Sequence, residues 1–117
     1  MSQRVFISLI LCHLNNGIMI NIKIEFVIKP NESLEFVGKI VKEFINNIRK
    51  NEPATIEYTS FQYKDNERHF VHFMTFTDED AQLKHRNTAY CQDFVSKLYP
   101  LCEKEPEVYG LEKVAKK

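Results

Sequence analysis

The first regular element of the chain is recognised by apolar residues at every second position. Apolar and polar residues alternate over positions 20–28, so one face of an extended segment carries the apolar side chains. These apolar residues are Ile20, Ile22, Ile24, Phe26 and Ile28. The pattern predicts a β-strand with one buried face, and Pro30 ends it because proline has no N–H for a strand ladder.

A helical period follows directly. Apolar residues recur at spacings of three and four over residues 34–48, which predicts an amphipathic helix of about four turns. Its apolar stripe consists of Leu34, Val37, Val41, Phe44, Ile45 and Ile48. Residues 31–33 supply an N-cap and an acid near the positive end of the helix dipole. Residues 51–53 close the helix.

Two further strands are predicted at residues 54–64 and 68–76. Both segments are rich in β-branched and aromatic residues, and the short polar connection 65–67 predicts an antiparallel hairpin. In the first strand the apolar residues change face partway along. Ile56 and Tyr58 share one face, whereas Phe61 and Tyr63 share the other. This change predicts a bulge or bend near Ser60.

The strand at residues 68–76 is apolar on both faces. One face carries Phe70, Met74 and Phe76, and the other carries Val71 and Phe73. An antiparallel strand of this kind must be covered on both sides. Helices cover one side, and a second copy of the chain is the simplest cover for the other. The pattern therefore predicts a homodimer.

After Thr77 the residues of one face again recur at helical spacing. Together with Asp80 this residue forms a start that resembles a capping box, and the acids between them suit a helix N-terminus. Helical spacing continues over residues 81–102 and predicts one helix that breaks or kinks near its end, at Pro100. A final short strand is predicted at residues 108–114.

The predicted order of elements is β-α-β-β-α-β. Right-handed crossovers turn this order into a ferredoxin-like α+β fold, a four-stranded antiparallel sheet with two helices on one face. Two such sheets packed through their bare faces form a dimeric α+β barrel.

Composition narrows the class of protein. A length of 117 residues suits one domain with its own core. The formal net charge is zero and no basic cluster is present, which argues against nucleic acid as a partner. No segment approaches the ~20 apolar residues of a membrane span. The three cysteines, Cys12, Cys91 and Cys102, fit no zinc-ligand spacing, so we expect reduced thiols in a cytoplasmic protein.

Residues 1–18 differ from the rest of the chain. The apolar stretch 5–11 follows a single charge, Arg4, and lacks a small-residue cleavage pattern, so it is a weak secretory signal. The regular pattern begins just after Met19. We therefore expect the folded domain to be residues 19–117, preceded by a poorly ordered extension or an over-long start.

His85 is the first candidate for chemistry. It lies on the inward stripe of the second predicted helix. An imidazole at that place can deprotonate a phenol, since its pKa lies near working pH. A packing histidine bonded to backbone fits the same position, and both interpretations stay open at this point.

Four more residues are predicted to line a substrate pocket. They are His72, Tyr58, Phe73 and Tyr90. The tyrosines can donate a hydrogen bond to a substrate oxygen or to backbone, and the phenylalanine is first of all a core residue. His72 faces either the pocket or the dimer interface. His69 points to the opposite face of its strand, so the two histidines cannot share one ion and no metal site is predicted.

Several short motifs carry a resemblance to a known family. They are FVHF at 70–73, TDEDA at 77–81 with His85 four residues on, FVSKLYP at 94–100 and PEVY at 106–109. With these motifs, residues 19–114 resemble the antibiotic-biosynthesis-monooxygenase-like domains of the dimeric α+β barrel superfamily.

The resemblance implies a homodimer with a pocket between helices and sheet in each subunit. Characterised members include oxygenases without a cofactor, which act on quinols or polyketide-derived phenols. Related haem-degrading enzymes use a helix histidine as iron ligand beside an Asn and a Trp. His85 could match that histidine, but the chain contains no Trp, which disfavours haem degradation.

Two classes of function fit these observations. The first is a monooxygenase without a cofactor that acts on a small aromatic, quinol-type molecule, with His85 as the base. The second is a homodimer that binds a small apolar ligand without turning it over, as a stress-related protein or a haem-binding relative. The sequence leaves the choice between enzyme and binding protein open.

Overall fold

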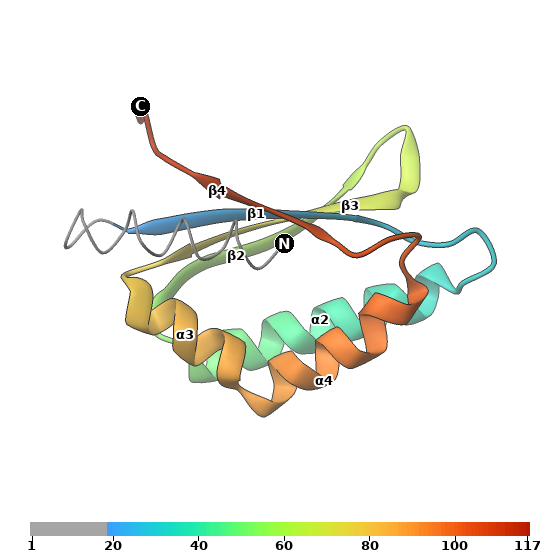
Figure 1. Ribbon diagram of the computed structural model, residues 1–117, viewed down its shortest axis with the longest axis horizontal. Coiled ribbons are helices and arrows are strands. Elements are labelled where there is room, and N and C mark those ends of the chain that lie inside the picture. The colour runs from blue at the N-terminus through green and yellow to red at the C-terminus, as the bar shows by residue number, and fades with distance from the viewer. Residues whose placement is uncertain (1–18) are drawn as a thin grey trace.

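The computed structural model describes residues 19–117, and the expectations for residues 1–18, including Cys12, lie outside this part of the chain. One antiparallel sheet packs its inner face on the helices (Figure 1). The elements are β1 (Ile20–Val27), α2 (Leu34–Asn51), β2 (Thr55–Tyr63), β3 (Asn66–Phe76), α3 (Glu79–Asn87), α4 (Ala89–Leu98), the 3₁₀ turn η1 (Tyr99–Leu101) and β4 (Glu107–Leu111). The strands lie in the order β2-β3-β1-β4. The predicted ferredoxin-like α+β fold is confirmed.

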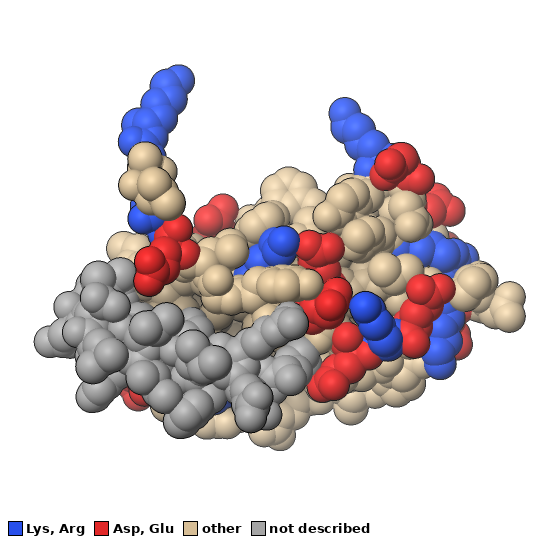
Figure 2. All heavy atoms as spheres, turned by 45° about the horizontal axis from the view of Figure 1, so that its top comes forward, with Lys and Arg blue, Asp and Glu red and all other residues tan. Residues whose placement is uncertain are grey.

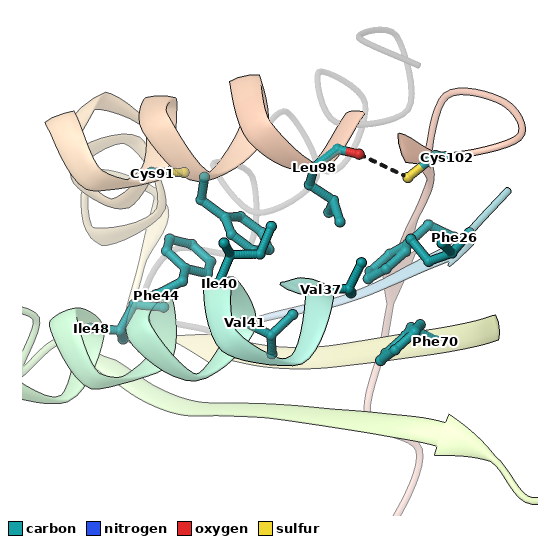
Figure 3. Close-up of a cluster of buried hydrophobic side chains, with 12 residues drawn as sticks. Phe26, Val37, Ile40, Val41, Phe44, Ile48, Phe70, Cys91, Leu98 and Cys102 are labelled. Atoms are coloured by element: carbon teal, nitrogen blue, oxygen red, sulfur yellow. Dashed lines mark hydrogen bonds between the residues drawn. The ribbon is translucent and has the colours of Figure 1, made fainter. Parts of the chain in front are cut away.

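Helix α2 forms one side of the core. Ser33 caps it, because the Ser33 hydroxyl accepts a hydrogen bond from the backbone N–H of Phe36 at 3.1 Å. The residues that α2 buries are Val37, Ile40, Val41, Phe44 and Ile48. Figure 3 shows Phe44 of α2 and Leu98 of α4 pointing into the same space between the helices and the sheet. Phe44 stacks on Phe94 of α4 with ring centroids 4.2 Å apart, which ties the two helices together.

The two faces of β3 have different surroundings. Phe70, His72, Met74 and Phe76 are buried on the helix side. On the opposite face, which we call the outer face of the sheet, Val71 is buried but Phe73 is 36% exposed. Figure 2 turns the outer face toward the reader and shows uncharged side chains interleaved with acidic and basic ones. The helices of this chain therefore cover one of the two apolar faces of β3.

The predicted bulge near Ser60 is wrong. Ser60 pairs regularly with His72 in the middle of the hairpin. The register of β2 against β3 shifts near the two ends instead, between Thr55 and Glu57 and between Gln62 and Tyr63. Strand β2 lies at an edge of the sheet, where such shifts are common.

The predicted single helix over residues 81–102 is also wrong, because it divides into α3 and α4 at Thr88. The Thr88 hydroxyl donates to the carbonyl of His85 at 2.9 Å and accepts from the N–H of Cys91 at 3.2 Å. Thr88 thus ends one helix and caps the next, and its backbone is extended. At the start of α3 the cap is Asp78 rather than Thr77, since the Asp78 carboxylate accepts from the N–H of Ala81 at 2.8 Å.

Other features of the described residues bear on the function. Cys91 and Cys102 are free thiols and both are buried. None of the helices between residues 19 and 117 is long and apolar enough to cross a membrane. Within the same residues, no three His, Cys, Asp or Glu side chains come together as a metal site.

Candidate functional site

A cavity of about 540 Å³ lies between the inner face of the sheet and the helices. Residues of all four strands form one wall, and residues of α2, α3 and α4 form the other. The apolar residues that line it include Ile24, Phe26, Phe44, Met74, Phe76 and Phe94. Such walls suit a flat apolar molecule, and the few polar groups among them decide how it would be oriented.

His85 lies in the last turn of α3 and lines the cavity. Its side chain is only 7% exposed, and its Nδ1 lies 2.8 Å from Oε1 of Glu52. The rings of Phe44, Tyr58 and Phe76 surround the imidazole at centroid distances of 5.6, 5.8 and 5.2 Å. Because the carboxylate occupies Nδ1, Nε2 is the nitrogen left to meet a ligand.

Glu52 is the site residue that the sequence did not reveal. It is the C-cap of α2, and its side chain is only 8% exposed. Besides facing His85, this carboxylate accepts hydrogen bonds from the hydroxyl of Thr55 at 2.7 Å and from the hydroxyl of Tyr90. Burial alone would raise the pKa of Glu52, but the bonds from His85, Tyr90 and Thr55 outweigh it and lower that pKa. The carboxylate therefore keeps its charge although it is nearly out of water.

His72 lies in the middle of β3 and is 1% exposed. Of the two places left open by the sequence, the structure gives it the cavity side of the sheet. Its Nδ1 lies 2.9 Å from the hydroxyl of Tyr58, whereas its Nε2 has no hydrogen-bond partner among the described residues. Burial lowers the pKa of His72 to about 4, so the ring is neutral near pH 7.

The other predicted pocket residues divide between the cavity and its surroundings. Tyr58 lines the cavity. Tyr90 does not line it and reaches the site through its bond to Glu52. The prediction that Phe73 lines this pocket is wrong, because Phe73 lies on the outer face beside Phe61, with ring centroids 6.1 Å apart. Strict alternation along β3 turns its neighbour His72 inward and therefore turns Phe73 outward.

Further polar groups lie at the rim and inside the cavity. The exposed lining residues are Arg86, Gln92, Ser96 and Glu105. Inside, Gln82 is buried and its Oε1 lacks a hydrogen-bond partner within residues 19–117. Cys91 also lines the cavity, and burial raises the pKa of its thiol to about 11. That thiol stays protonated at neutral pH and is a poor nucleophile.

The cavity thus holds two histidines with different chemistry. His85 is bonded through Nδ1 to the carboxylate of Glu52, which fixes the orientation of the ring and leaves Nε2 outside that bond. His72 is held by a phenol and is kept neutral by burial. An apolar cavity lined by an imidazole that is bonded to a carboxylate and by a second imidazole that is neutral can hold a small aromatic molecule and exchange a proton with it.

Comparison with known proteins gives a family match and several similar folds. Residues 19–97 match the family model described as Antibiotic biosynthesis monooxygenase. A crystal structure described as antibiotic biosynthesis monooxygenase superposes with a TM-score of 0.75 at 22% identity, over 82% of this chain and 99% of the other. A protein from Mycobacterium tuberculosis has a TM-score of 0.75 at 15% identity, over 85% of this chain and 98% of its own.

A conserved protein from Methanosarcina mazei Go1 is similar to the same degree. It has a TM-score of 0.73 at 20% identity, over 86% of this chain and 98% of its own. Identities this low show a common fold and carry no information on substrate. A search of curated proteins gave no significant match.

Proposed function

Because the chain belongs to the antibiotic biosynthesis monooxygenase family, we propose that it is a monooxygenase that oxidises a small quinol-type aromatic molecule without a bound cofactor. Membership of this family supports an oxidoreductase of the monooxygenase type and leaves the substrate unspecified. The proposal for the substrate and for the residues that act on it comes from the chemistry of the cavity.

The Glu52–His85 pair carries this proposal. A phenolic O–H has a pKa of about 10 in water, so a base must lower the cost of forming its anion. His85 Nε2 is available for this task, while the carboxylate on Nδ1 fixes the ring and stabilises the imidazolium that forms. The aromatic walls around His85 exclude water from the anion and place it beside the base.

The reaction balances with molecular oxygen as the only co-reactant. The quinol anion gives an electron to O₂, and the two radicals combine at a ring carbon to form a peroxide. Loss of water from the peroxide leaves a hydroxyquinone. One oxygen atom enters the ring, the other leaves as water, and the quinol supplies all four electrons. The part of the protein is to remove the phenolic proton at His85 and to return it for the departing water.

Oxygen uptake over a panel of quinols tests the proposal. We expect the wild-type protein to consume oxygen and His85→Ala to be slower by roughly 10²–10⁴-fold, the usual contribution of a general base. His69→Ala is the matched control, because His69 also pairs with a glutamate but lies on the outer face of the sheet. Equal rates for wild type and His85→Ala would remove His85 from the mechanism.

A haem-binding protein is a second candidate that one observation favours. Histidines that ligate a metal through one ring nitrogen commonly donate the other to a carboxylate, which is the arrangement of His85 and Glu52. Titration with haemin separates this candidate from the first. A Soret shift that disappears in His85→Ala would support it, and the absence of any shift would dismiss it.

A binding protein without catalysis is the remaining alternative. In this alternative the ligand binds in the same cavity but is not oxidised. If tight binding of quinols is found without oxygen uptake by the wild-type protein, this alternative replaces the monooxygenase.

We also propose that the chain forms a homodimer through the outer face of the sheet. Phe61 and Phe73 contact each other there and both remain exposed in the single chain. Light scattering at micromolar concentration should give the dimer mass, and Phe73→Glu should give the monomer. Phe36→Glu is the matched control, because Phe36 is 41% exposed, against 36% for Phe73, but lies on α2. A wild-type protein that is monomeric at this concentration would contradict the proposal.

A further inference from the structure

The hydrogen-bond pattern around His72 determines which ring nitrogen carries its proton. The Tyr58 hydroxyl is its neighbour at Nδ1, and burial raises the pKa of that phenol well above its usual value, so the phenol keeps its proton. If Tyr58 donates to Nδ1, Nε2 carries the hydrogen and is the one unmatched donor. If Nδ1 donates instead, both the Tyr58 hydrogen and the Nε2 lone pair are unmatched. The first arrangement leaves fewer buried groups unpaired and is favoured.

An unpaired N–H group at this depth is costly unless something binds to it. His72 is 1% exposed, lines the cavity and has no partner for Nε2 within the described chain. A buried donor left without an acceptor costs roughly 1–3 kcal/mol. A ligand that supplies an acceptor recovers this cost.

We propose that the Nε2–H group of His72 is a ligand-binding donor, and that the cavity selects uncharged molecules that present an acceptor oxygen, such as a ring carbonyl, to it. This inference rests on the proposed function only in taking the same cavity as the ligand site. His85 then removes a proton from the ligand, while His72 holds an oxygen elsewhere on it.

The surroundings of His72 select against a charged oxygen. Phe26 meets the imidazole edge-on with ring centroids 5.1 Å apart, and Phe94 lies parallel to it at 6.4 Å. An anion placed among these neutral groups would lose its hydration without gaining a counter-charge. A carbonyl or ether oxygen loses much less, and one N–H donor satisfies it.

One small molecule can reach both histidines. The Tyr58 ring lies against His72 at a centroid distance of 5.4 Å and against His85 at 5.8 Å. The two imidazoles are therefore neighbours of the same ring, and both line the cavity. A bicyclic or larger aromatic ligand can give its acidic O–H to His85 and its carbonyl oxygen to His72.

Two probes of equal shape test the inference. 1-Tetralone and tetralin differ by one carbonyl oxygen, and their binding is measured by NMR titration of the full-length protein. We expect wild type to prefer 1-tetralone by about 10-fold, as one hydrogen bond to a buried donor provides. His72→Phe should lower the ratio to about 1, and His69→Phe, which changes a histidine on the outer face of the sheet, should leave it unchanged. A wild-type ratio near 1, no binding of either probe, or an unchanged ratio in His72→Phe would overturn the inference.

A second measurement needs no variant and does not depend on turnover. The side-chain ¹⁵N spectrum should show His72 as a neutral ring with hydrogen on Nε2 and none on Nδ1. The opposite tautomer would overturn the inference even if His72→Phe failed to fold. If no quinol is oxidised but the tautomer and the probe ratio hold, the monooxygenase proposal fails and the ligand-binding role of His72 stands.

Discussion

Two clusters of one glutamate, one histidine and one tyrosine lie on opposite sides of the sheet, the inner one on the helices and the outer one on the strands. The inner cluster is Glu52, His85 and Tyr90, and the outer cluster is Glu25, His69 and Tyr63. The histidine-to-carboxylate distances are nearly equal, 2.8 Å in the inner cluster and 2.9 Å in the outer one. The side chains of the inner pair are 7% and 8% exposed, whereas those of the outer pair are 27% and 19% exposed.

The surroundings make these similar clusters behave differently. Glu25 also pairs with Lys23 at 2.9 Å, and the hydrogen bond from this lysine is the main cause that lowers the pKa of Glu25. Tyr63 stacks flat on His69 with ring centroids 3.9 Å apart and covers its ring. Within residues 19–117 no lysine or arginine pairs with Glu52, which is held by Thr55 and Tyr90 beside the cavity. Burial beside the cavity, rather than the residue types, makes the inner histidine a candidate base.

The largest expected effect is the loss of the inner carboxylate. Glu52→Ala leaves the donors of His85, Tyr90 and Thr55 without an acceptor, and we expect unfolding to become easier by about 3–5 kcal/mol. Glu25→Ala in the isolated subunit should cost about 1 kcal/mol or less, because its partners can turn to water. Urea unfolding of the two variants measures both values. Equal losses would show that burial does not distinguish the clusters.

A somewhat smaller change in stability should come from the protonation of His72, whose ring is bonded to Tyr58 and not to a carboxylate. Its pKa is lowered by burial to about 4 in the folded protein and is near 6.5 when unfolded. The unfolded chain thus takes up the proton first as the pH falls. The free energy of unfolding therefore has its full value above pH 6.5 as far as His72 is concerned. It falls progressively between pH 6.5 and pH 4, by about 3 kcal/mol in all.

The unfolding free energy at pH 7 and at pH 4 measures this loss. His72→Phe should lose less stability over the same interval, since the carboxylates that titrate there are common to both proteins. If wild type and His72→Phe show the same pH dependence, burial does not keep His72 neutral in the folded protein.

The fold and part of the site follow from local sequence patterns, but the inner cluster does not. Alternation along β3 correctly puts His72 on the face of Phe70, and helical spacing puts His85 on an inward stripe. The same alternation applied strictly would have turned Phe73 away from the pocket. Local patterns predict directions well because they are set by backbone geometry alone.

Glu52 shows why the rest could not be predicted. Its contact with His85 joins residues 33 positions apart, and it forms only because the end of α2 meets the end of α3. The sequence at this point indicates only that the helix ends, because Pro53 follows and cannot continue it. The break at Thr88 is equally hidden, since threonine within a helical pattern either continues the helix or caps a new one.

Removing the tyrosine hydroxyl from each cluster should also destabilise the inner cluster more than the outer one, but by a smaller amount. The Tyr90 hydroxyl donates to the buried carboxylate of Glu52, so we expect Tyr90→Phe to cost about 2 kcal/mol, as for a hydrogen bond to a charged group. The Tyr63 hydroxyl lies 3.5 Å from Glu25, and Tyr63→Phe should cost about 0.5 kcal/mol or less. Urea unfolding of both variants tests this, and a larger loss in Tyr63→Phe would reverse the ranking of the clusters.

The smallest expected effect is that of His69→Ala, and it depends on whether a second subunit is present. In the isolated subunit the exposed His69–Glu25 pair should contribute about 0.5 kcal/mol. If the outer face is the dimer interface that we propose, the second subunit buries this pair and the loss should grow with protein concentration. Unfolding and light scattering at nanomolar and at high micromolar protein measure both quantities. A loss that stays small while the protein is dimeric would place the interface elsewhere and keep the outer cluster in solvent.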